Sequence, residues 1–578
     1  FQIIDICNIE AKSLTLHEIS RNELIILYEQ ISLTMNLKRH YTIRYSLLFV
    51  FIFLLSNISI VVAQRSVGGT PISFLSKNES AFSKPAGKID GWQPIVFGTD
   101  SQGVTEKRLK ALSVKTCFIA GDIDKSTLEK NIARLDDQIP TLLLNGGDSL
   151  QEVAIGHLCD ALQERDLVYC DTDELNINGA KSSPRFLPDW NPELQFSTAY
   201  INTGVMIKTA LLKSLHITNQ TTIAEIVTEL SLTIKSLAIN HLPLPLVHQL
   251  PEKKGELNTL ERVKTVIEKH TNAKVELDEQ FSVNRVCWPN SNPLVSLIIP
   301  TKNGKALVKA CIESILEKTT YKNYEILLID NGSDEQESIE YFDYLDTLDK
   351  VRVLRYPAPF NYSAINNFGV EHAKGSILGL VNNDIEVISP NWLTYMVGHA
   401  EREDVGCVGA KLLYSDTRIQ HAGVVLGYGG GAGHAHKNFP RFHTGYLKRI
   451  VATNNYSAVT AACLLVKRTD FAAVSGLNEK DLSVAFNDVD FCLKVKGLGV
   501  NNVYCAEAEL FHHESVSRGL DISPEKAARF NRELAYLQTT WSDFIANDPA
   551  YNPNLTLKRE NFSIRSAVEL KEWHIRHS

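Results

Sequence analysis

Three short apolar runs, each followed at once by polar residues, constrain the fold of this chain more than any other feature. They read VSLIIP (295–300), EILLID (325–330) and ILGLVNND (377–384). Apolar runs of this length are typical of strands that are buried on both faces, as in a largely parallel sheet. Ligands of such sheets bind beyond the carboxyl ends of the strands. The sequence therefore predicts an α/β fold whose site is built from the polar residues that follow these strands.

A second set of such runs lies earlier in the chain: PIVFGTD, VKTCFIAG, PTLLLNGG and DLVYCDTDE. Both regions show the same coarse order of elements, which indicates a diverged duplication, and 578 residues are enough for several domains. We expect five segments along the chain. They are an N-terminal extension with a linker (1–90), a first α/β domain (91–250), a connector with a helical pattern (251–290), a second α/β domain (291–520) and a helical tail (521–578).

The N-terminal extension contains an apolar stretch, SLLFVFIFLLSNISIVVA, at residues 46–63. Its length is close to that of a membrane-spanning helix, and Lys38, Arg39 and Arg44 precede it. Three interpretations stay open: a signal peptide, a membrane anchor, or upstream sequence that is never translated. We expect a membrane segment, and hence a membrane-associated protein.

Charge and cysteine content exclude several classes of function. Lys and Arg number 59 against 67 Asp and Glu, which gives a formal net charge of −8. A protein that binds nucleic acid normally presents a basic face, so nucleic acid is not an expected partner. Ten cysteines without metal-ligand spacing are too few for a disulfide scaffold and are expected to be reduced.

Four polar motifs in the second domain are candidates for chemistry. Asp384, at the end of Asn382-Asn383-Asp384, could bind Mg²⁺ or Mn²⁺, although Asn and Asp are also common in turns. Asp330 and Asn331 could contact a nucleotide or form a tight turn. In FNDVDFCLK, Asp488 or Asp490 could be a general base or cap a helix. The adjacent His512 and His513 should point to opposite sides of an extended chain, so only one of them should reach the site.

The order VSLIIPTKN, YEILLIDNGS, GLVNND, FNDVDFCLK and FHHES resembles the family 2 glycosyltransferases, which have the GT-A fold. The stretches PFNYSAINNFGVEHAKG, SAVTAACLLVKR and HHESVSRG resemble the bacterial members that act on O-antigen and other surface polysaccharides. The resemblance covers about residues 296–563. It implies transfer of a sugar, with inversion, from a nucleotide-diphosphate sugar to a glycan or lipid-linked glycan acceptor, with the active site on the cytoplasmic side.

The resemblance also implies roles for individual residues. The divalent cation would be held by Asp384 with His512, and Asp488 would be the catalytic base. The implied donor-binding residues are Thr301, Asp330, Asn331, Asn382 and Asn383. The family's acidic pair at the base is here Asn487-Asp488, and its metal motif keeps only one carboxylate. These departures allow an alternative, a carbohydrate-binding or scaffold protein that retains the fold; a nucleotidyltransferase is disfavoured, because TKNGK is a poor phosphate loop.

The first domain resembles the same family more faintly. Its Asp171-Thr172-Asp173 looks like a metal motif, but by position the metal loop falls on residues 145–148, Asn-Gly-Gly-Asp. No base motif follows between Ile217 and Leu250. We therefore expect a degenerate domain that serves as scaffold or binds the acceptor, with Asp171 and Asp173 in a solvated turn or capping the next element. In the second domain, Gly429-Gly430-Gly431 suggests either a mobile loop near the acceptor or a flexible surface loop.

Overall fold

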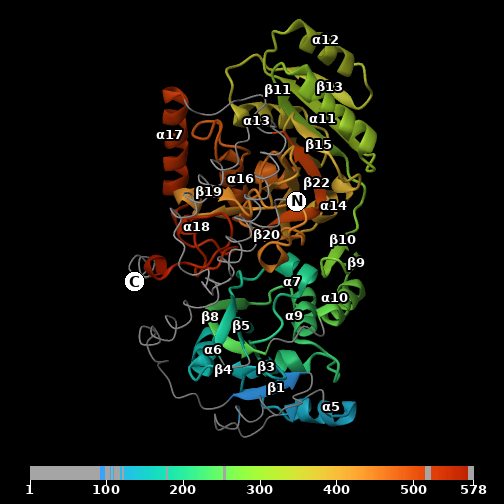
Figure 1. Ribbon diagram of the computed structural model, residues 1–578. Coiled ribbons are helices and arrows are strands. Elements are labelled where there is room, and N and C mark those ends of the chain that lie inside the picture. Colours follow the sequence, from blue (N-terminus) through green and yellow to red (C-terminus); the bar gives the residue numbers. More distant parts are fainter. Residues whose placement is uncertain are drawn as a thin grey trace, which may run out of the picture. The chain divides into compact units, whose positions relative to one another are not determined.

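The second α/β region forms a mixed sheet of ten strands in the computed structural model (Figure 1). The structure describes residues 92–97, 105, 109, 118–119, 123–176, 180–250, 256–513 and 523–570. The apolar segment 46–63 lies outside them, and no helix within the described ranges is long and apolar enough to cross a membrane.

The strands of the second sheet follow the order β13-β12-β11-β14-β21-β16-β22-β15, with β17 on β16 and β20 on β22. The strand bounds are β11 Val295–Thr301, β12 Tyr324–Asp330, β13 Val351–Arg355, β14 Ile377–Val381, β15 Ile385–Val387, β16 Val405–Leu413, β17 Ile419–His421, β20 Asn454–Tyr456, β21 Cys463–Lys467 and β22 Asn501–His512. The helices are α11 Lys305–Lys318, α12 Gln336–Leu345, α13 Tyr362–His372, α14 Trp392–Ala400, α15 Arg468–Ala473, α16 Asn487–Lys496, α17 Pro524–Thr540 and α18 Ser542–Ala546. A short hairpin of β18 Val424–Leu426 and β19 Ala432–His434 encloses the glycine run.

Both faces of this sheet are buried, as its apolar runs predict. In β11, Leu297 and Ile299 pack in a core that includes Ile312 of α11 and Trp392 of α14. Ile298, between them, faces the opposite core, which includes residues of α13 and α16. Parallel pairing of β13, β12, β11 and β14 brings their carboxyl ends to one edge.

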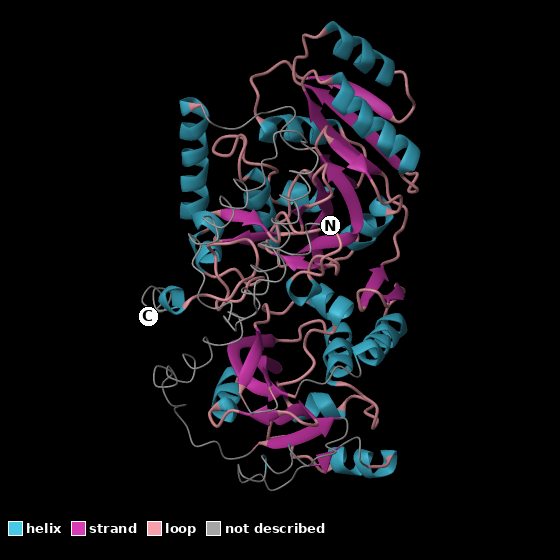
Figure 2. Ribbon diagram, in the orientation of Figure 1, coloured by secondary structure: helices cyan, strands magenta, loops and turns pink. Residues whose placement is uncertain are grey.

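The first sheet has eight strands in the order β2-β1-β3-β7-β5-β8-β4, with β6 on β5 (Figure 2). Its strands are β1 Gln93–Phe97, β2 Phe118–Ile119, β3 Thr141–Asn145, β4 Ser149–Leu150, β5 Leu167–Leu175, β6 Lys181–Arg185, β7 Val205–Ile207 and β8 Ile239–Gln249. Its helices are α5 Lys125–Ala133, α6 Ala154–Leu162, α7 Pro192–Thr198, α8 Thr209–Lys213 and α9 Ile223–Thr233.

The two sheets share one topology. The path β2-β1-β3-β7-β5-β8-β4 of the first matches β12-β11-β14-β21-β16-β22-β15 of the second, strand for strand. Directions match too: β1–β3 and β11–β14 are parallel, whereas β3–β7 and β14–β21 are antiparallel. The α/β class and the shared order of elements are confirmed, and each strand on this path has a counterpart in the other sheet.

Two expectations need correction. The helical pattern of the connector holds only for α10 Glu256–His270, after which β9 Lys274–Asp278 and β10 Val283–Cys287 form a hairpin. The run DTDE does not form a solvated turn: Asp171 and Asp173 lie within β5 and are 0% and 3% exposed. Both carboxylates contact histidines of β8, which offset part of the cost of burying them.

Candidate active site

The loop after β14 lies against the neighbouring strand end. Asn383 donates from Nδ2 to Oγ1 of Thr301, the last residue of β11, over 2.9 Å. Thr301 is paired in register with Asp330 at the end of β12. The sequence-predicted residues of three separate loops therefore meet at one edge of the sheet.

Asp384 and His512 form a buried pair beside this loop. Asp384 immediately precedes β15, whose first residue Ile385 is in register with His512 of β22. The His512 Nε2 atom lies 3.1 Å from the Asp384 carboxylate. Burial alone would raise the pKa of Asp384, but the hydrogen bond and charge of His512 lower it. His513 points away, toward Ser415 and Glu386, so the expected split of the histidine pair is confirmed.

The hydrogen bond of the other ring nitrogen, Nδ1, orients the imidazole of His512. Nδ1 lies 2.8 Å from the Oε1 atom of Gln420, which can only accept, so Nδ1 carries the proton. Nε2 lies beside the Asp384 carboxylate and the Asn382 amide; without its proton, its lone pair would be available to a cation. An imidazole lone pair next to an ionised carboxylate, with a second partner orienting the ring, is a suitable donor set for Mg²⁺ or Mn²⁺.

A cation at this position would need ligands from outside the protein. Among the described residues, no group of three or more His, Cys, Asp or Glu side chains is placed to hold a metal ion. The oxygen atoms of a diphosphate and of water could complete the coordination, which is the usual arrangement for Mg²⁺ in phosphate-binding sites.

Asp488 lies in the first turn of α16 and is half-buried. Its Oδ2 atom accepts a hydrogen bond from the backbone N–H of Ala461, at 3.1 Å. Burial raises the pKa of Asp488, although the hydrogen bond from Ala461 and further hydrogen bonds to the carboxylate oppose this rise. A raised pKa makes the carboxylate a stronger proton acceptor, as a general base requires.

The alternative base, Asp490, is occupied by structural contacts. Its side chain is fully buried, accepts a hydrogen bond from the indole of Trp541 at 2.9 Å, and forms an ion pair with Lys494 at 2.6 Å. Asn487, which replaces the acidic residue before Asp488, donates to the carbonyl of Val484. Of the two aspartates, the contacts favour Asp488 for proton transfer.

One residue that sequence reasoning missed, Tyr362, connects the Asn382–Asp384 loop to the residue that contacts Asp488. Its hydroxyl lies 3.2 Å from Oδ1 of Asn382 and 3.1 Å from the carbonyl oxygen of Ala461. The N–H of the same Ala461 bonds to Asp488. Tyr362 occurs in the stretch PFNYSAINN, but nothing in that stretch indicates which loops its hydroxyl reaches.

Asp330 and Asn331 have partners within the protein. Asp330 accepts hydrogen bonds from Ser333 and forms an ion pair with Arg355 at 2.5 Å. Asn331 donates to the carbonyl oxygens of Tyr356 and Ala358. These contacts shape the loop after β12, and the expected contact with a nucleotide stays a prediction.

A cavity of about 430 Å³ lies next to the start of α16. Phe486, which caps α16 two residues before Asp488, forms part of its wall. Other parts are Phe530 of α17, Gly429 and Gly431 of the glycine run, and residues 557–560 of the tail. Aromatic and glycine surfaces of this kind suit the faces of sugar rings.

The counterpart of the Asp384–His512 pair in the first sheet has different contacts. Asp148 immediately precedes β4, and Ser149 is in register with His248, as Ile385 is with His512. Asp148, however, accepts hydrogen bonds from Thr203 and from the backbone of Asn145, and burial raises its pKa to about 7. His248 pairs with Asp173 at 2.5 Å.

Comparison with known proteins is consistent with these features. Residues 296–469 match the family described as glycosyl transferase family 2. An uncharacterized protein of Sinorhizobium fredii is 42% identical over 434 residues, which are 72% of this chain and 48% of that protein. The O-antigen biosynthesis protein RfbC of Myxococcus xanthus is 31% identical over 80% of this chain and 37% of its own length. The chain thus spans less than half the length of these two relatives.

Solved structures align only distantly. One is a mannosyltransferase from Pyrobaculum calidifontis in complex with GDP-Man and Mn²⁺. The alignment includes 43% of this chain and 66% of the mannosyltransferase chain, with 13% identity and a TM-score of 0.33. The family assignment therefore rests on the sequence match over residues 296–469.

Proposed function

Because residues 296–469 form a glycosyltransferase family 2 domain, we propose that the protein transfers a sugar from a nucleotide-diphosphate sugar to a hydroxyl of a glycan acceptor. The observation that carries this proposal is the chain of contacts from Asp384 and His512 through Asn382 and Tyr362 to Asp488. It joins a site for the donor's diphosphate to a base for the acceptor within one connected structure.

In the proposed reaction, the acceptor oxygen forms a bond to the anomeric carbon while the bond from that carbon to the diphosphate breaks. The proton of the acceptor hydroxyl passes to Asp488, and the electron pair of the broken bond leaves with the diphosphate. Attack from the face opposite the leaving group inverts the anomeric centre. Asp384 and His512 would hold a divalent cation, which when bound stabilises the negative charge of the diphosphate.

The similarity to an O-antigen biosynthesis protein supports a role in surface polysaccharide synthesis, with a glycan or lipid-linked glycan as acceptor. The apolar segment 46–63 is the reason to propose association with a membrane. The supply of nucleotide sugars within the cell is the reason to propose an active site on the cytoplasmic side. The first domain is proposed to be catalytically silent.

Release of nucleoside diphosphate tests the proposal. Purified protein with Mn²⁺ is incubated with UDP-, dTDP- and GDP-sugars, with and without a panel of octyl glycosides as acceptors. We expect release from one class of donor, and its loss with EDTA. Binding of a sugar or glycan without release from any donor would instead support a carbohydrate-binding or scaffold protein.

A further inference from the structure

The tail segment, defined here as residues 548–560, contacts both domains and forms part of the wall of the cavity beside Phe486. At its start, Asp548 accepts hydrogen bonds from the backbone N–H of Leu426 and from the hydroxyl of Ser457. Leu426 ends β18, three residues before Gly429, the first residue of the glycine run. At its end, residues 557–560 form one wall of the cavity.

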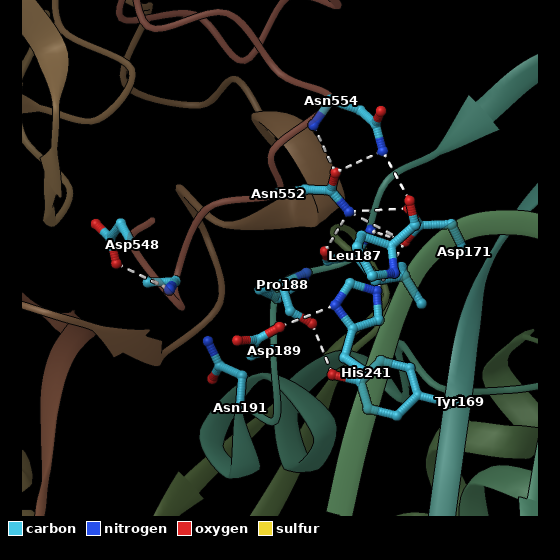
Figure 3. Close-up of polar contacts among 12 residues, drawn as sticks. Tyr169, Asp171, Leu187, Pro188, Asp189, Asn191, His241, Asp548, Asn552 and Asn554 are labelled. Atoms are coloured by element: carbon cyan, nitrogen blue, oxygen red, sulfur yellow. Dashed lines mark hydrogen bonds and ion pairs between the residues drawn. The ribbon is translucent and has the colours of Figure 1, made fainter. Parts of the chain in front are cut away.

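The middle of the tail segment is hydrogen-bonded to the first domain (Figure 3). The Asn552 amide donates to both oxygens of Asp171, over 2.9 and 3.2 Å, and to the carbonyl of Leu187 over 2.8 Å. Asn554 donates to the carbonyl of Pro243 over 3.0 Å. Asn552 is only 2% exposed, so these bonds are shielded from water.

Asp171 is itself held in place by His241. The His241 side chain is 1% exposed and its two ring nitrogens each lie 3.0 Å from a carboxylate, one of Asp171 and one of Asp189. The ring of Tyr169 stacks on it with centroids 4.8 Å apart. A buried imidazole between two carboxylates keeps its proton, which gives Asp171 a compensating charge and a fixed position.

A matched pair lies next to this anchor and has no part in it. Asp173 and His248 belong to the same two strands as Asp171 and His241, and their side chains contact each other. Asp173 contacts His248, whereas Asp171 contacts both His241 and Asn552 of the tail segment. The Asp173–His248 pair thus has a structural role within the first domain, whereas the Asp171–His241 pair also contacts the segment that leads to the cavity.

We propose that Asp171, His241 and Asn552 are positioning residues through which the first domain sets the acceptor-binding wall of the second. The buried anchor fixes residues 552–554, and the six residues that follow carry this constraint to the cavity beside Phe486. Acceptor recognition would then depend on a domain that contributes no group to the reaction. This inference rests on the proposed transfer function, because it assigns the cavity to the acceptor.

Hydrogen–deuterium exchange tests the positioning without an acceptor. The full chain is compared with Asn552→Ala and, as the matched control, Asp173→Asn. We expect peptides covering residues 555–562 and the glycine run to exchange about tenfold faster in Asn552→Ala, equivalent to about 1.4 kcal/mol of local stability. They should be unchanged in Asp173→Asn. Equal exchange in Asn552→Ala and wild type would overturn the proposal.

Steady-state kinetics with the best octyl glycoside distinguish positioning from general damage. In Asn552→Ala the KM for the acceptor should rise about tenfold, while the KM for the donor and the release of nucleoside diphosphate without acceptor stay within about twofold of wild type. A parallel rise of both KM values, or none, would contradict the inference. Asn554→Ala, which removes the hydrogen bonds to Pro243 and to Asn552 Oδ1 but keeps those from Asn552 to Asp171, provides a milder variant if Asn552→Ala does not fold. Absence of donor turnover in the wild type would refute the proposed function instead.

Discussion

The same position in the two sheets holds aspartates with opposite properties. Asp384 immediately precedes β15, which pairs with β22, and Asp148 immediately precedes β4, which pairs with β8. The pKa of Asp384 is lowered by His512, whereas that of Asp148 is raised to about 7 because it is buried without a cationic partner. A carboxylate that keeps its charge can bind a cation, and one that is half protonated near neutral pH binds it poorly.

Substitution of Asp384 should therefore remove the cation dependence of donor binding. In Asp384→Ala, we expect the affinity for the nucleotide sugar measured by calorimetry to be the same in Mn²⁺ and in EDTA, whereas wild type and Asp148→Asn bind more tightly with Mn²⁺. A Mn²⁺ effect that survives in Asp384→Ala would show that the cation binds elsewhere.

At the scale of elements, the strands could be read from the sequence and the contacts between loops could not. Uninterrupted apolar runs such as EILLID require burial on both faces, so β11, β12 and β14 were predictable together with the polar residues that follow them. Tyr362 and Ala461 are separated by 99 residues, and Asp171 and His241 by 70. Their contacts depend on strand register and loop path, for which a single sequence carries no local signal.

The bridge between the cation loop and the base loop predicts a defined kinetic effect. Tyr362→Phe keeps the buried ring and removes only the hydroxyl that contacts Asn382 and Ala461. We expect kcat to fall by about tenfold, because Ala461, whose N–H bonds to Asp488, loses its hydrogen bond with Tyr362. The melting temperature should change little. Ser363→Ala, on the same helix, serves as the control. An unchanged kcat in Tyr362→Phe would mean that the two loops are positioned independently.

At the scale of the whole molecule, charge inside the first domain contributes to the stability of the described fold. Burial alone would lower the pKa of His241, but Asp171 and Asp189 raise it to about 9. A histidine whose pKa is higher in the folded state stabilises fully below its unfolded pKa of about 6.5, and this contribution is lost as pH rises through about 9.

The melting temperature of the wild type should therefore fall between pH 6.5 and 9.5 by roughly 4 °C more than that of His241→Gln, which has no such proton to lose. Differential scanning calorimetry across this range gives the comparison. Parallel curves for wild type and His241→Gln would show that the imidazole is not charged in the folded protein.

If a single site with Asp488 as its base carries out transfer, Asp488→Asn should lose turnover. Loss of a general base typically lowers the rate by about 10²–10⁴-fold. Nucleoside diphosphate release is measured for wild type, Asp488→Asn and Asp148→Asn, with donor affinity measured alongside. We expect Asp488→Asn to bind donor normally but to turn over about 10²–10⁴-fold more slowly, while Asp148→Asn retains full activity. Near-wild-type turnover in Asp488→Asn, or its loss in Asp148→Asn, would contradict this expectation.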